Sequence, residues 1–349
     1  GVEAAGGKGF TVYNHMLLPT VFKSVEEDYH HLKSAVQVWD VAVERQVELR
    51  GPDAARLMQM LTPRDLRGML PGQCYYVPIV DETGGMLNDP VALKLSEDRW
   101  WISIADSDLL FWVKALAYGY RLDVLVDEPD VSPLAVQGPK ADDLMAEVFG
   151  DAVRATKFFR FGWFDFQGVT MAVARSGYSK QGGFEIYVDG TKNGMPLWNT
   201  LFEAGKDMDV RAGCPNLIER IEGGLLSYGN DMNRENTPHE CGLGRFCSVQ
   251  TAIGCVGRDA LLRVAKEGPT QQIRAIAIEG EIPACDQVWP IMAKGKRIGQ
   301  VTSAAKSPDY NTNVAIGMVR MTHWDQDTEV QVHTSDGVRA ATVHEQFWI

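Results

Sequence analysis

The sequence predicts an α+β fold with antiparallel sheets, followed by a small all-β domain, either a barrel or a jelly-roll-like sandwich. Three features indicate this. The order strand, Gly-Pro, helix occurs twice, in VELRGPDAARLMQML and in LAVQGPKADDLMAEVF. Strand-like stretches follow the first of these in succession, as in an antiparallel meander. Five or more short strand-like stretches follow a polar linker predicted at residues 264–272.

The first half of the chain begins with a helix that leads into a strand. Apolar residues at helical spacing predict a helix over 25–36. The alternating stretch VWDVAVERQVELRG then predicts one strand ending at Gly51-Pro52, and AARLMQMLT predicts a second short helix. CYYVPIV, PVALKLSED and RWWISIA predict consecutive strands, of which the first two are joined by a turn at Gly84-Gly85.

The second half repeats this order and then adds helices. Residues 161–188 predict a hairpin that turns at Gly168, joined to a third strand by a glycine-rich loop. Helices are predicted over 195–205 and over 216–229, and in the second the pair Gly223-Gly224 indicates close backbone packing.

The 349 residues are enough for two or three domains. We expect residues 1–265 to form an α+β region of two interleaved subdomains, with roughly 50–130 forming much of the second. We expect residues 270–349 to form the C-terminal β-barrel domain.

Charge and hydropathy exclude several classes of protein. The 46 Asp and Glu residues outnumber the 34 Lys and Arg residues, which gives a net charge of -12. Such a surface repels phosphate backbones and anionic lipid, so neither nucleic acid nor a membrane is an expected partner. No run approaches the roughly 20 apolar residues of a membrane span, and the first residues, GVEAAGGKGF, lack the apolar core of a secretory signal. We therefore expect a cytoplasmic protein.

Cysteine spacing and short motifs give no sign of a metal or nucleotide site. The six cysteines are scattered without a CxxC pair, which favours reduced, packed thiols over a disulfide framework or a zinc site. The Walker loop, GxGxxG after a strand, GxSxG and HExxH are absent. We expect no bound metal.

Four clusters place polar residues where a strand meets a tight turn: GGMLNDP at 84–90, SGYSKQGGFEIY at 176–187, ERIEGGLLSYGNDM at 219–232 and TPHECGLGRF at 237–246. In order and spacing they resemble the aminomethyltransferase family, the tetrahydrofolate-dependent T protein of the glycine cleavage system. The family patterns GG-x-x-DD, GYTGExGxEI and RLEAGxxLYGxxM resemble GGMLND, GYSKQGGFEI and RIEGGLLSYGNDM of this chain. The C-terminal pattern GxVTSGxxSPxL resembles GQVTSAAKSPDY at 299–310.

The resemblance implies a three-domain ring that holds the pterin of tetrahydrofolate at its centre. In the family, the glutamate matched by Glu185 hydrogen-bonds the pterin edge, and the aromatic residue matched by Tyr178 lies in the same site. A carboxylate suits this role because it accepts two N–H bonds from a 2-aminopyrimidine edge. The resemblance also assigns folate contacts to Asn88, Tyr228 and Arg220, and catalytic roles to Asn88, Asp89 and Tyr178.

Three positions depart from the family pattern. Asn88 stands where the first aspartate of the DD pair, catalytic in the family, is expected, while Asp89 keeps the second. Ala105 stands for a family asparagine by ungapped counting, and Arg245 for the tryptophan after GLG. Glycine cleavage expels an amine, and a nearby carboxylate can assist the proton movement, whereas an amide accepts no proton at neutral pH. These departures argue against glycine-cleavage chemistry.

A sulfonium methyl donor fits the departures better. Displacement at its methyl group releases a neutral thioether, so the leaving group needs no proton and alignment of the reactants supplies most of the catalysis. The stretches VYNHMLLP and GGMLNDPVALKL and the short barrel resemble the demethylases of this family that act on dimethylsulfoniopropionate. That resemblance implies methyl transfer from dimethylsulfoniopropionate to tetrahydrofolate, giving methylthiopropionate and 5-methyltetrahydrofolate.

Recognition of such a substrate calls for aromatic rings and a guanidinium. Nine Trp and ten Tyr residues suffice for an aromatic box around a small cation, at roughly 0.5 to 2 kcal/mol per contact. The substrate-binding candidates are Trp101, Trp163 and Tyr76, beside Tyr178, for the cation, and Arg245 and Arg175 for the carboxylate. The alternatives are a place in the core for each tryptophan and an ion pair with a surface acid such as Glu240 for each arginine.

Other functions stay open at this point. One is an aminomethyltransferase or a demethylase of another methylated amine or aryl ether; another is a non-catalytic folate-binding protein like the iron–sulfur assembly proteins of this superfamily. Those proteins carry KGCYxGQE, whereas IGCVGRDA at 253–260 resembles the enzymes' IGREAL, so we expect Cys255 to be a packed thiol. The expected partners are folate and a small-molecule methyl donor, and a homodimer is one assembly we consider.

Overall fold

The computed structural model describes all residues, Gly1–Ile349. The chain divides into two compact units, each built from separated segments. Unit 1 consists of Gly1–Gln59, Leu66–Val77 and Asp89–Asn216, and unit 2 of Met60–Asp65, Pro78–Asn88 and Leu217–Ile349. The domain boundaries predicted above, 1–265 and 270–349, stay predictions, and so does the ring.

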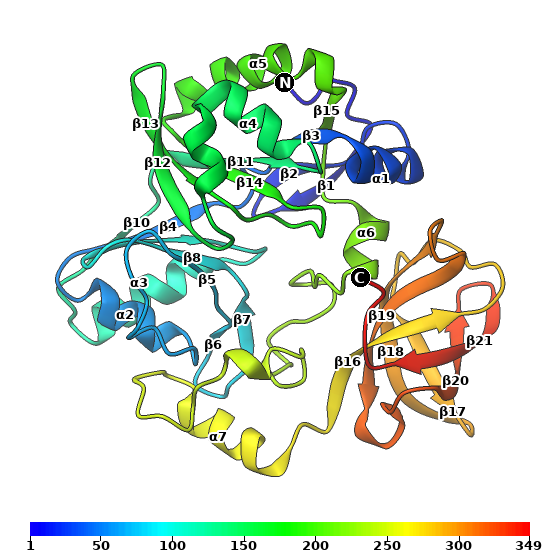
Figure 1. The fold of residues 1–349 in the computed structure, drawn as a ribbon. Coiled ribbons are helices and arrows are strands. Elements are labelled where there is room, and N and C mark those ends of the chain that lie inside the picture. Colours follow the sequence, from blue (N-terminus) through cyan, green and yellow to red (C-terminus); the bar gives the residue numbers. More distant parts are fainter. The chain divides into compact units, whose positions relative to one another are not determined.

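A six-stranded sheet forms the larger half of unit 1. Its order is β12 (Phe161–Phe166), β13 (Val169–Ala174), β14 (Gly183–Asp189), β11 (Val131–Gln137), β3 (Val36–Asp40) and β15 (Val210–Gly213), antiparallel except between β3 and β15. Helices α4 (Ala141–Phe149) and α5 (Gly194–Ala204) cover one face (Figure 1), where Phe184 and Ile186 pack with Leu144 and Leu197. Because strand side chains alternate, Glu185 points to the opposite face.

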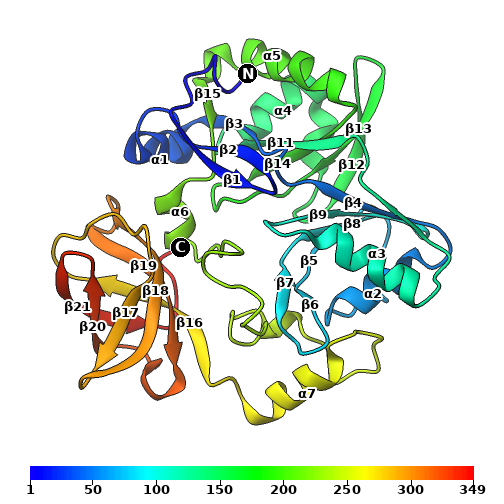
Figure 2. The same cartoon turned by 180° about the vertical axis from the view of Figure 1, so that it is seen from behind.

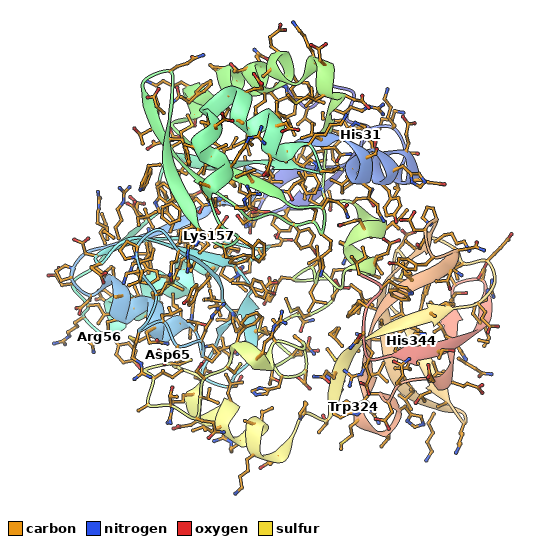
Figure 3. All side chains as sticks on the ribbon, viewed as in Figure 1. His31, Arg56, Asp65, Lys157, Trp324 and His344 are labelled. Carbon is orange, nitrogen blue, oxygen red and sulfur yellow. The ribbon has the colours of Figure 1, made fainter.

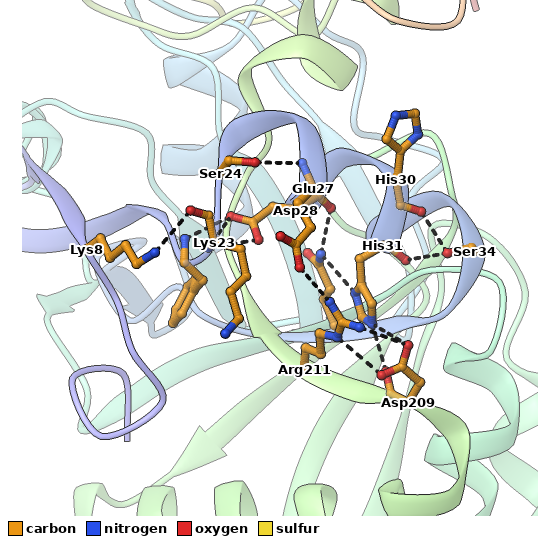
Figure 4. Close-up of polar contacts among 12 residues, drawn as sticks. Lys8, Lys23, Ser24, Glu27, Asp28, His30, His31, Ser34, Asp209 and Arg211 are labelled. Carbon is orange, nitrogen blue, oxygen red and sulfur yellow. Dashed lines mark hydrogen bonds and ion pairs between the residues drawn. The ribbon is translucent and has the colours of Figure 1, made fainter.

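Helix α1 (Val25–Ser34) leads into this sheet and is fixed at both ends (Figure 4). The Ser24 hydroxyl caps it by accepting a hydrogen bond from the Glu27 N–H at 3.0 Å. Near the other end, His31 Nε2 lies 2.8 Å from the carbonyl oxygen of Asp209, just before β15. These contacts set the direction in which the chain enters β3.

A five-stranded sheet forms the rest of unit 1. Its order is β10 (Leu125–Asp127), β4 (Gln46–Arg50), β9 (Arg99–Ser103), β8 (Val91–Ser96) and β5 (Cys74–Tyr76), antiparallel throughout. Helices α2 (Ala54–Leu61) and α3 (Leu109–Gly119) belong to the same part of the chain. A hairpin of β1 (Gly9–Tyr13) and β2 (Met16–Val21) places Leu18 against Trp39 and Ala135, on the larger sheet's face opposite α4 (Figure 2).

Unit 2 combines a short ribbon, two helices and a closed barrel. Strand β6 (Ile79–Val80) pairs with β7 (Met86–Asn88), and the helices are α6 (Leu217–Glu222) and α7 (Arg258–Glu267). The barrel order is β16 (Gln271–Ile278), β19 (Thr312–Arg320), β18 (Lys296–Ser307), β17 (Trp289–Ala293), β20 (Thr328–Thr334) and β21 (Gly337–His344). Figure 3 marks Trp324 and His344 on this barrel, where the Trp324 carbonyl accepts a hydrogen bond from Arg274 Nε at 2.7 Å.

The predicted fold class is confirmed: both sheets of unit 1 are mainly antiparallel and the C-terminal strands close into a barrel. The repeated Gly-Pro motif has a physical cause. Gly51 and Gly138 have φ of 144° and 123°, and a Cβ there would lie 2.6 Å from the Asp123 carbonyl oxygen and 2.5 Å from that of Ala35. Only glycine permits these approaches where each strand turns into its helix.

Some predicted elements are wrong in their extent. The single strand predicted over 38–51 is β3 and β4, which belong to different sheets and are separated by a turn at 41–45. CYYVPIV is likewise divided between β5 and β6. The helix predicted over 216–229 ends at Glu222, because Gly224 has φ of 62° and packs against Phe347. Helix α3 was not predicted, and α7 extends into the predicted linker. None of the helices combines the length and the hydropathy needed to cross a membrane.

Candidate active site

Glu185 stands on the face of the larger sheet opposite α4 and α5, between two small side chains. Its directly paired neighbours are Ala174 on β13 and Ala135 on β11, and Ala135 is paired in turn with Trp39 on β3. Directly paired antiparallel residues share one face of a sheet. The carboxylate is therefore flanked by methyl groups, the smallest side chains other than glycine.

The glycine-rich loop that precedes β14 is held by one buried amide. Gln137 Nε2 donates to the carbonyl oxygens of Ser176 at 3.1 Å and Phe184 at 3.3 Å, and Gln137 Oε1 accepts from the Ser179 hydroxyl at 2.8 Å. A Cβ at Gly177 would lie 2.1 Å from Gln137 Nε2, so a side chain there would displace the anchor. The glycines that carried the sequence resemblance thus allow the loop to close onto β11.

This loop brings a hydroxyl to the predicted pterin-binding carboxylate. Glu185 is only 6% exposed and accepts a hydrogen bond from the Ser176 hydroxyl. Burial raises the pKa of Glu185, and the hydrogen bond from Ser176 offsets part of that rise. The Ser176 hydroxyl therefore supports the ionised form, which is the form that accepts N–H bonds.

A second carboxylate, Glu44, is affected by the charge of the first. It lies in the turn between β3 and β4, where its N–H donates to the Val41 carbonyl at 2.9 Å. Burial and, next, the negative charge of Glu185 raise the pKa of Glu44 well above its usual range, while a hydrogen bond from Ser103 on β9 lowers it. The charge of Glu185 thus disfavours the ionised form of Glu44.

Tyr13, at the end of β1, brings a phenol to these carboxylates. Burial, followed by the charges of Glu44 and Asp89, raises the pKa of Tyr13 well above its usual range. The next two residues, Asn14 and His15, have φ of 47° and 64°, as in a two-residue hairpin turn. The turn ends the strand at Tyr13 and so fixes the position of its ring.

Two predicted residues, Tyr76 and Tyr178, complete this neighbourhood. The Tyr76 hydroxyl, on β5, donates to Asp89 Oδ2 at 2.8 Å. Tyr178 packs, half-buried, against Trp39, and its phenol is among the groups that raise the pKa of Tyr13. We call the six residues linked by these bonds and charges the carboxylate site: Tyr13, Glu44, Tyr76, Asp89, Tyr178 and Glu185.

The two candidate tryptophans lie in a chain of aromatic rings. Trp101 is 1% exposed, and its Nε1 donates to Glu48 Oε1 at 3.0 Å. Its ring centroid lies 6.0 Å from that of Tyr187 and 6.3 Å from that of Trp163, which is 48% exposed. Trp101 packs in the core, as in the structural alternative above, and substrate contacts for Trp101 and Trp163 stay predictions.

The guanidinium of Arg175 already donates hydrogen bonds to other groups of the protein. Its Nη1 and Nη2 donate to the two carboxylate oxygens of Asp142 at 2.8 and 3.0 Å, and its Nε donates to the Thr156 carbonyl at 2.6 Å. The guanidinium also lies 4.4 Å from the ring centroid of Phe184. The predicted substrate contact of Arg175 would compete with this bidentate pair and stays a prediction.

The remaining predicted residues belong to unit 2. Asn88 is fully buried at the end of β7. The Tyr228 hydroxyl donates to the Met86 carbonyl at 2.7 Å, so Tyr228 holds the strand that carries Asn88. Their contacts with folate stay predictions, but this bond gives Tyr228 a positioning role.

Two arginines of unit 2 have different environments. Arg220 Nη1 lies 2.9 Å from Asp231 Oδ2, and Nη2 donates to the Ser303 hydroxyl on β18 at 2.7 Å. This buried pair joins α6 to the barrel. Arg245 is exposed and stacks on Phe246 at 4.8 Å from the ring centroid. Folate binding by Arg220 and substrate binding by Arg245 stay predictions.

The residues present suit a reduced pterin. The Glu185 carboxylate is an acceptor for a 2-aminopyrimidine edge, its sheet neighbours are alanines, and tyrosine rings stand beside it. Sequence reasoning missed Glu44, Tyr13, Ser103, Ser176 and Gln137. The only signal in the sequence was polarity within otherwise apolar stretches, such as the glutamate in DVAVERQVEL.

Comparison with known proteins identifies the family. Residues 2–251 match the GCVT N-terminal domain, and residues 272–348 match the glycine cleavage T-protein C-terminal barrel domain. The chain therefore belongs to the glycine cleavage T-protein (GCVT) family, which confirms the resemblance drawn from its motifs.

Among its relatives, the chain is 62% identical over 348 residues to dimethylsulfoniopropionate demethylase DmdA of Ruegeria pomeroyi, covering 100% of this chain and 95% of that protein. It is 28% identical over 328 residues to an aminomethyltransferase of Symbiobacterium thermophilum, and the match covers 90% of this chain and 86% of that protein. The fold matches that of glycine cleavage system aminomethyltransferase T from Bartonella henselae with a TM-score of 0.89 at 24% identity, covering 100% of this chain and 96% of that one.

Proposed function

We propose that this protein transfers a methyl group from dimethylsulfoniopropionate to tetrahydrofolate, giving methylthiopropionate and 5-methyltetrahydrofolate. The observation that carries the proposal is the 62% identity, over the full chain, to a protein named for dimethylsulfoniopropionate demethylation. The chain is thus a tetrahydrofolate-dependent methyltransferase rather than an aminomethyltransferase, in agreement with Asn88 in place of the family's catalytic aspartate.

The reaction is a displacement at the methyl carbon. The N5 lone pair of tetrahydrofolate forms the new C–N bond as the S–C bond breaks, and the bonding pair stays on sulfur as the neutral thioether. N5 then loses its proton, which water can accept. Because the leaving group needs no acid, the protein contributes by aligning N5, carbon and sulfur.

In this proposal the carboxylate site binds and orients the pterin. Glu185 accepts N–H bonds from the pyrimidine edge, and the hydrogen bond from Ser176 favours its ionised form. Tyr178 and Tyr76 provide ring faces beside it, and Asn88, held through β7 by Tyr228, aligns one of the reactants. Asp89 fixes the position of the Tyr76 ring by accepting a hydrogen bond from its hydroxyl.

The test is a donor screen. The purified protein is incubated with tetrahydrofolate and, separately, with dimethylsulfoniopropionate, dimethylglycine or an aryl methyl ether, and 5-methyltetrahydrofolate is followed by mass spectrometry. Product with the sulfonium alone is the expected result. Product with dimethylglycine alone, or measurable folate binding without product from any donor, contradicts the proposal.

Two further features belong to the proposal. A cytoplasmic location is supported by the six cysteines, all of which are free thiols. Assembly as a homodimer is a proposal without a dedicated structural feature, and analytical ultracentrifugation of the purified protein decides between one and two copies.

A further inference from the structure

Gln137 stands where strand β11 ends and the glycine-rich loop comes alongside it. Directly after Gln137, Gly138 has φ of 123° and turns the chain away into α4, and β14 begins only at Gly183, the residue paired with Gln137. Residues 176–182 therefore lie beyond the end of β11. A backbone bond from the Gly138 N–H to the Gly182 carbonyl, at 3.0 Å, joins the two segments at one point. The position of the loop thus depends on side chains.

The side-chain amide of Gln137 takes the place of the missing strand partner. Its Nε2 donates to the carbonyl oxygens of Ser176 at 3.1 Å and Phe184 at 3.3 Å, and its Oε1 accepts from the Ser179 hydroxyl at 2.8 Å. The side chain is fully buried. Both N–H groups and the carbonyl are in use, and a glutamate of the same length would lack the two donors. The amide holds the loop on both sides of Tyr178.

The held residues carry two groups of the carboxylate site. The Ser176 hydroxyl donates to Glu185 Oε2, and these two residues are only 4% and 6% exposed. Tyr178 lies between the two residues that the amide binds, and it packs against Trp39. Ser176 is thus bound through its carbonyl by Gln137 and through its hydroxyl to Glu185. A movement of the amide would therefore move the partner of the carboxylate.

We propose that Gln137 is a positioning residue of the folate site, which sets the place of the Glu185 carboxylate and the Tyr178 ring through its bonds to the loop. This inference rests on the proposed function, in which Glu185 accepts N–H bonds from the pterin. Hydrogen bonds are directional, so a carboxylate that has lost its fixed orientation binds the pyrimidine edge less well. Gln137 therefore governs tetrahydrofolate affinity while acting only through protein groups.

Positioning of Glu185 has a signature that stabilisation of the fold alone lacks. The hydrogen bond from Ser176 opposes the rise that burial causes in the pKa of Glu185. When that bond is lost, the pKa of Glu185 rises further, and the carboxylate becomes ionised only at a higher pH. The pH below which tetrahydrofolate affinity declines should then move upward.

Other titratable groups respond to the charge of Glu185. They are Glu44 in the turn after β3, Tyr187 on β14 and Cys74 on β5, and in each of them the pKa is raised, first by burial and also by Glu185. Tyr187 and Cys74 therefore stay neutral at ordinary pH. Glu44 is unaltered in every variant below, so a difference between the pH profiles of two variants reports on Glu185.

The experiment replaces Gln137 by Met, which keeps the length of the side chain and removes its donors and its acceptor. Kd for tetrahydrofolate is measured by anaerobic calorimetry, without a methyl donor, at a series of pH values. We expect binding to weaken about tenfold, as for one hydrogen bond to a charged group, and its decline to begin at a higher pH. Ser176→Ala should reproduce both effects, because it removes the hydroxyl that Gln137 positions.

Asn313→Leu is the matched control. Asn313 is also buried, at 3% exposure, and its Nδ2 donates to two carbonyl oxygens of the barrel, those of Ile278 at 2.8 Å and Gly280 at 2.6 Å. Its replacement should lower the melting temperature and leave tetrahydrofolate affinity and its pH profile unchanged. If Gln137→Met also loses only stability, Gln137 merely supports the fold and the inference is overturned.

Two further variants separate the possible failures. Unchanged tetrahydrofolate affinity in Glu185→Gln contradicts the role of Glu185 in the proposed function. Weaker binding in Glu185→Gln together with normal binding in Gln137→Met overturns only the inference about Gln137. If Gln137→Met does not fold, as judged by circular dichroism, Ser179→Ala releases the loop from the acceptor side of the same amide. It should weaken binding without moving the pH profile, and unchanged affinity in folded Ser179→Ala overturns the inference.

Discussion

Ser176 donates its hydroxyl hydrogen bond to Oε2 of Glu185, while its carbonyl oxygen accepts a bond from Gln137 Nε2 at 3.1 Å. One residue thus joins the glycine-rich loop both to the carboxylate of the site and to the end of β11. Because Gln137 is fully buried, this connection is shielded from water. The loop and the carboxylate are therefore positioned together.

Replacing Glu185 by Gln should weaken tetrahydrofolate binding. The change turns one acceptor into a donor that faces pterin N–H groups, and loss of a charge-assisted bond corresponds to a Kd about tenfold to a hundredfold higher. The measurement is Kd for tetrahydrofolate by calorimetry, with Glu147→Gln as the exposed control. Unchanged affinity would remove Glu185 from the folate site.

Two adjacent glycines of the loop should respond differently to alanine. A Cβ on Gly183 would lie 2.1 Å from the Val136 carbonyl oxygen, whereas Gly182, with φ of 76°, has nothing within 4 Å. Gly182→Ala should cost about 1 kcal/mol through its backbone conformation alone. Gly183→Ala should cost more than about 2 kcal/mol and also weaken folate binding, because β14 must shift. Urea unfolding and folate titration of both variants test this, and equal losses would contradict it.

Restoring the family aspartate in Asn88→Asp should not create glycine-cleavage activity. Other family positions, such as Ala105 and Arg245, still differ, and position 88 is fully buried, so a carboxylate there also costs stability. The assay is aminomethyl transfer by the variant, with thermal melting to follow stability. Robust aminomethyl transfer would show that this single position sets the choice of reaction.

Stability should fall on mild acidification partly because of His31. Burial is the main cause that lowers the pKa of His31 below 6.5 in the folded protein. As the pH falls through about 6.5, the unfolded chain takes up a proton that the folded chain resists, so the free energy of unfolding decreases. Above that pH the effect is absent.

The pH dependence of the melting temperature tests this expectation. His31→Gln should make it shallower, whereas His30→Gln, at a neighbouring position whose side chain is 54% exposed, should not. A residual slope is expected, because burial also lowers the pKa of His239. Identical slopes in the unaltered protein and in His31→Gln would exclude a contribution from His31.

Local patterns in the sequence were sufficient for the fold class. Alternation and helical spacing depend on neighbouring residues, so most strands, α1, α2, α4 and α5 were predicted near their observed positions. The pattern does not say which sheet a strand joins. The single strand predicted over 38–51 is therefore two strands, β3 and β4, separated by a turn. The single strand predicted for CYYVPIV is likewise two strands, β5 and β6, which belong to different sheets.

The residues of the candidate site also fall into those that sequence motifs indicate and those that only the folded structure reveals. Glycine-rich motifs pointed to Glu185, Tyr178 and Asp89 as candidates, since the spacing of a motif is a property of the chain itself. Glu44, Tyr13 and Ser103 carry no such signal, because each stands in a different segment and only chain folding brings their charges and hydroxyls together. The role of Gln137 as the anchor of the loop became visible only from the structure, in which a Cβ on Gly177 would clash with its side chain.

By itself, the sequence determined the α+β class, the all-β C-terminal domain, the family and the chemistry of methyl transfer to folate, whereas closure of the C-terminal strands into a barrel is seen only in the structure. Tertiary structure alone decided that Trp101 lies in the core, that Arg175 is held by Asp142, and that the charge of Glu185 raises the pKa of Glu44. The physical reason is that periodicity and motif spacing arise from local backbone geometry. Burial and electrostatic interaction instead depend on distances between residues far apart in the chain, which only the folded structure sets.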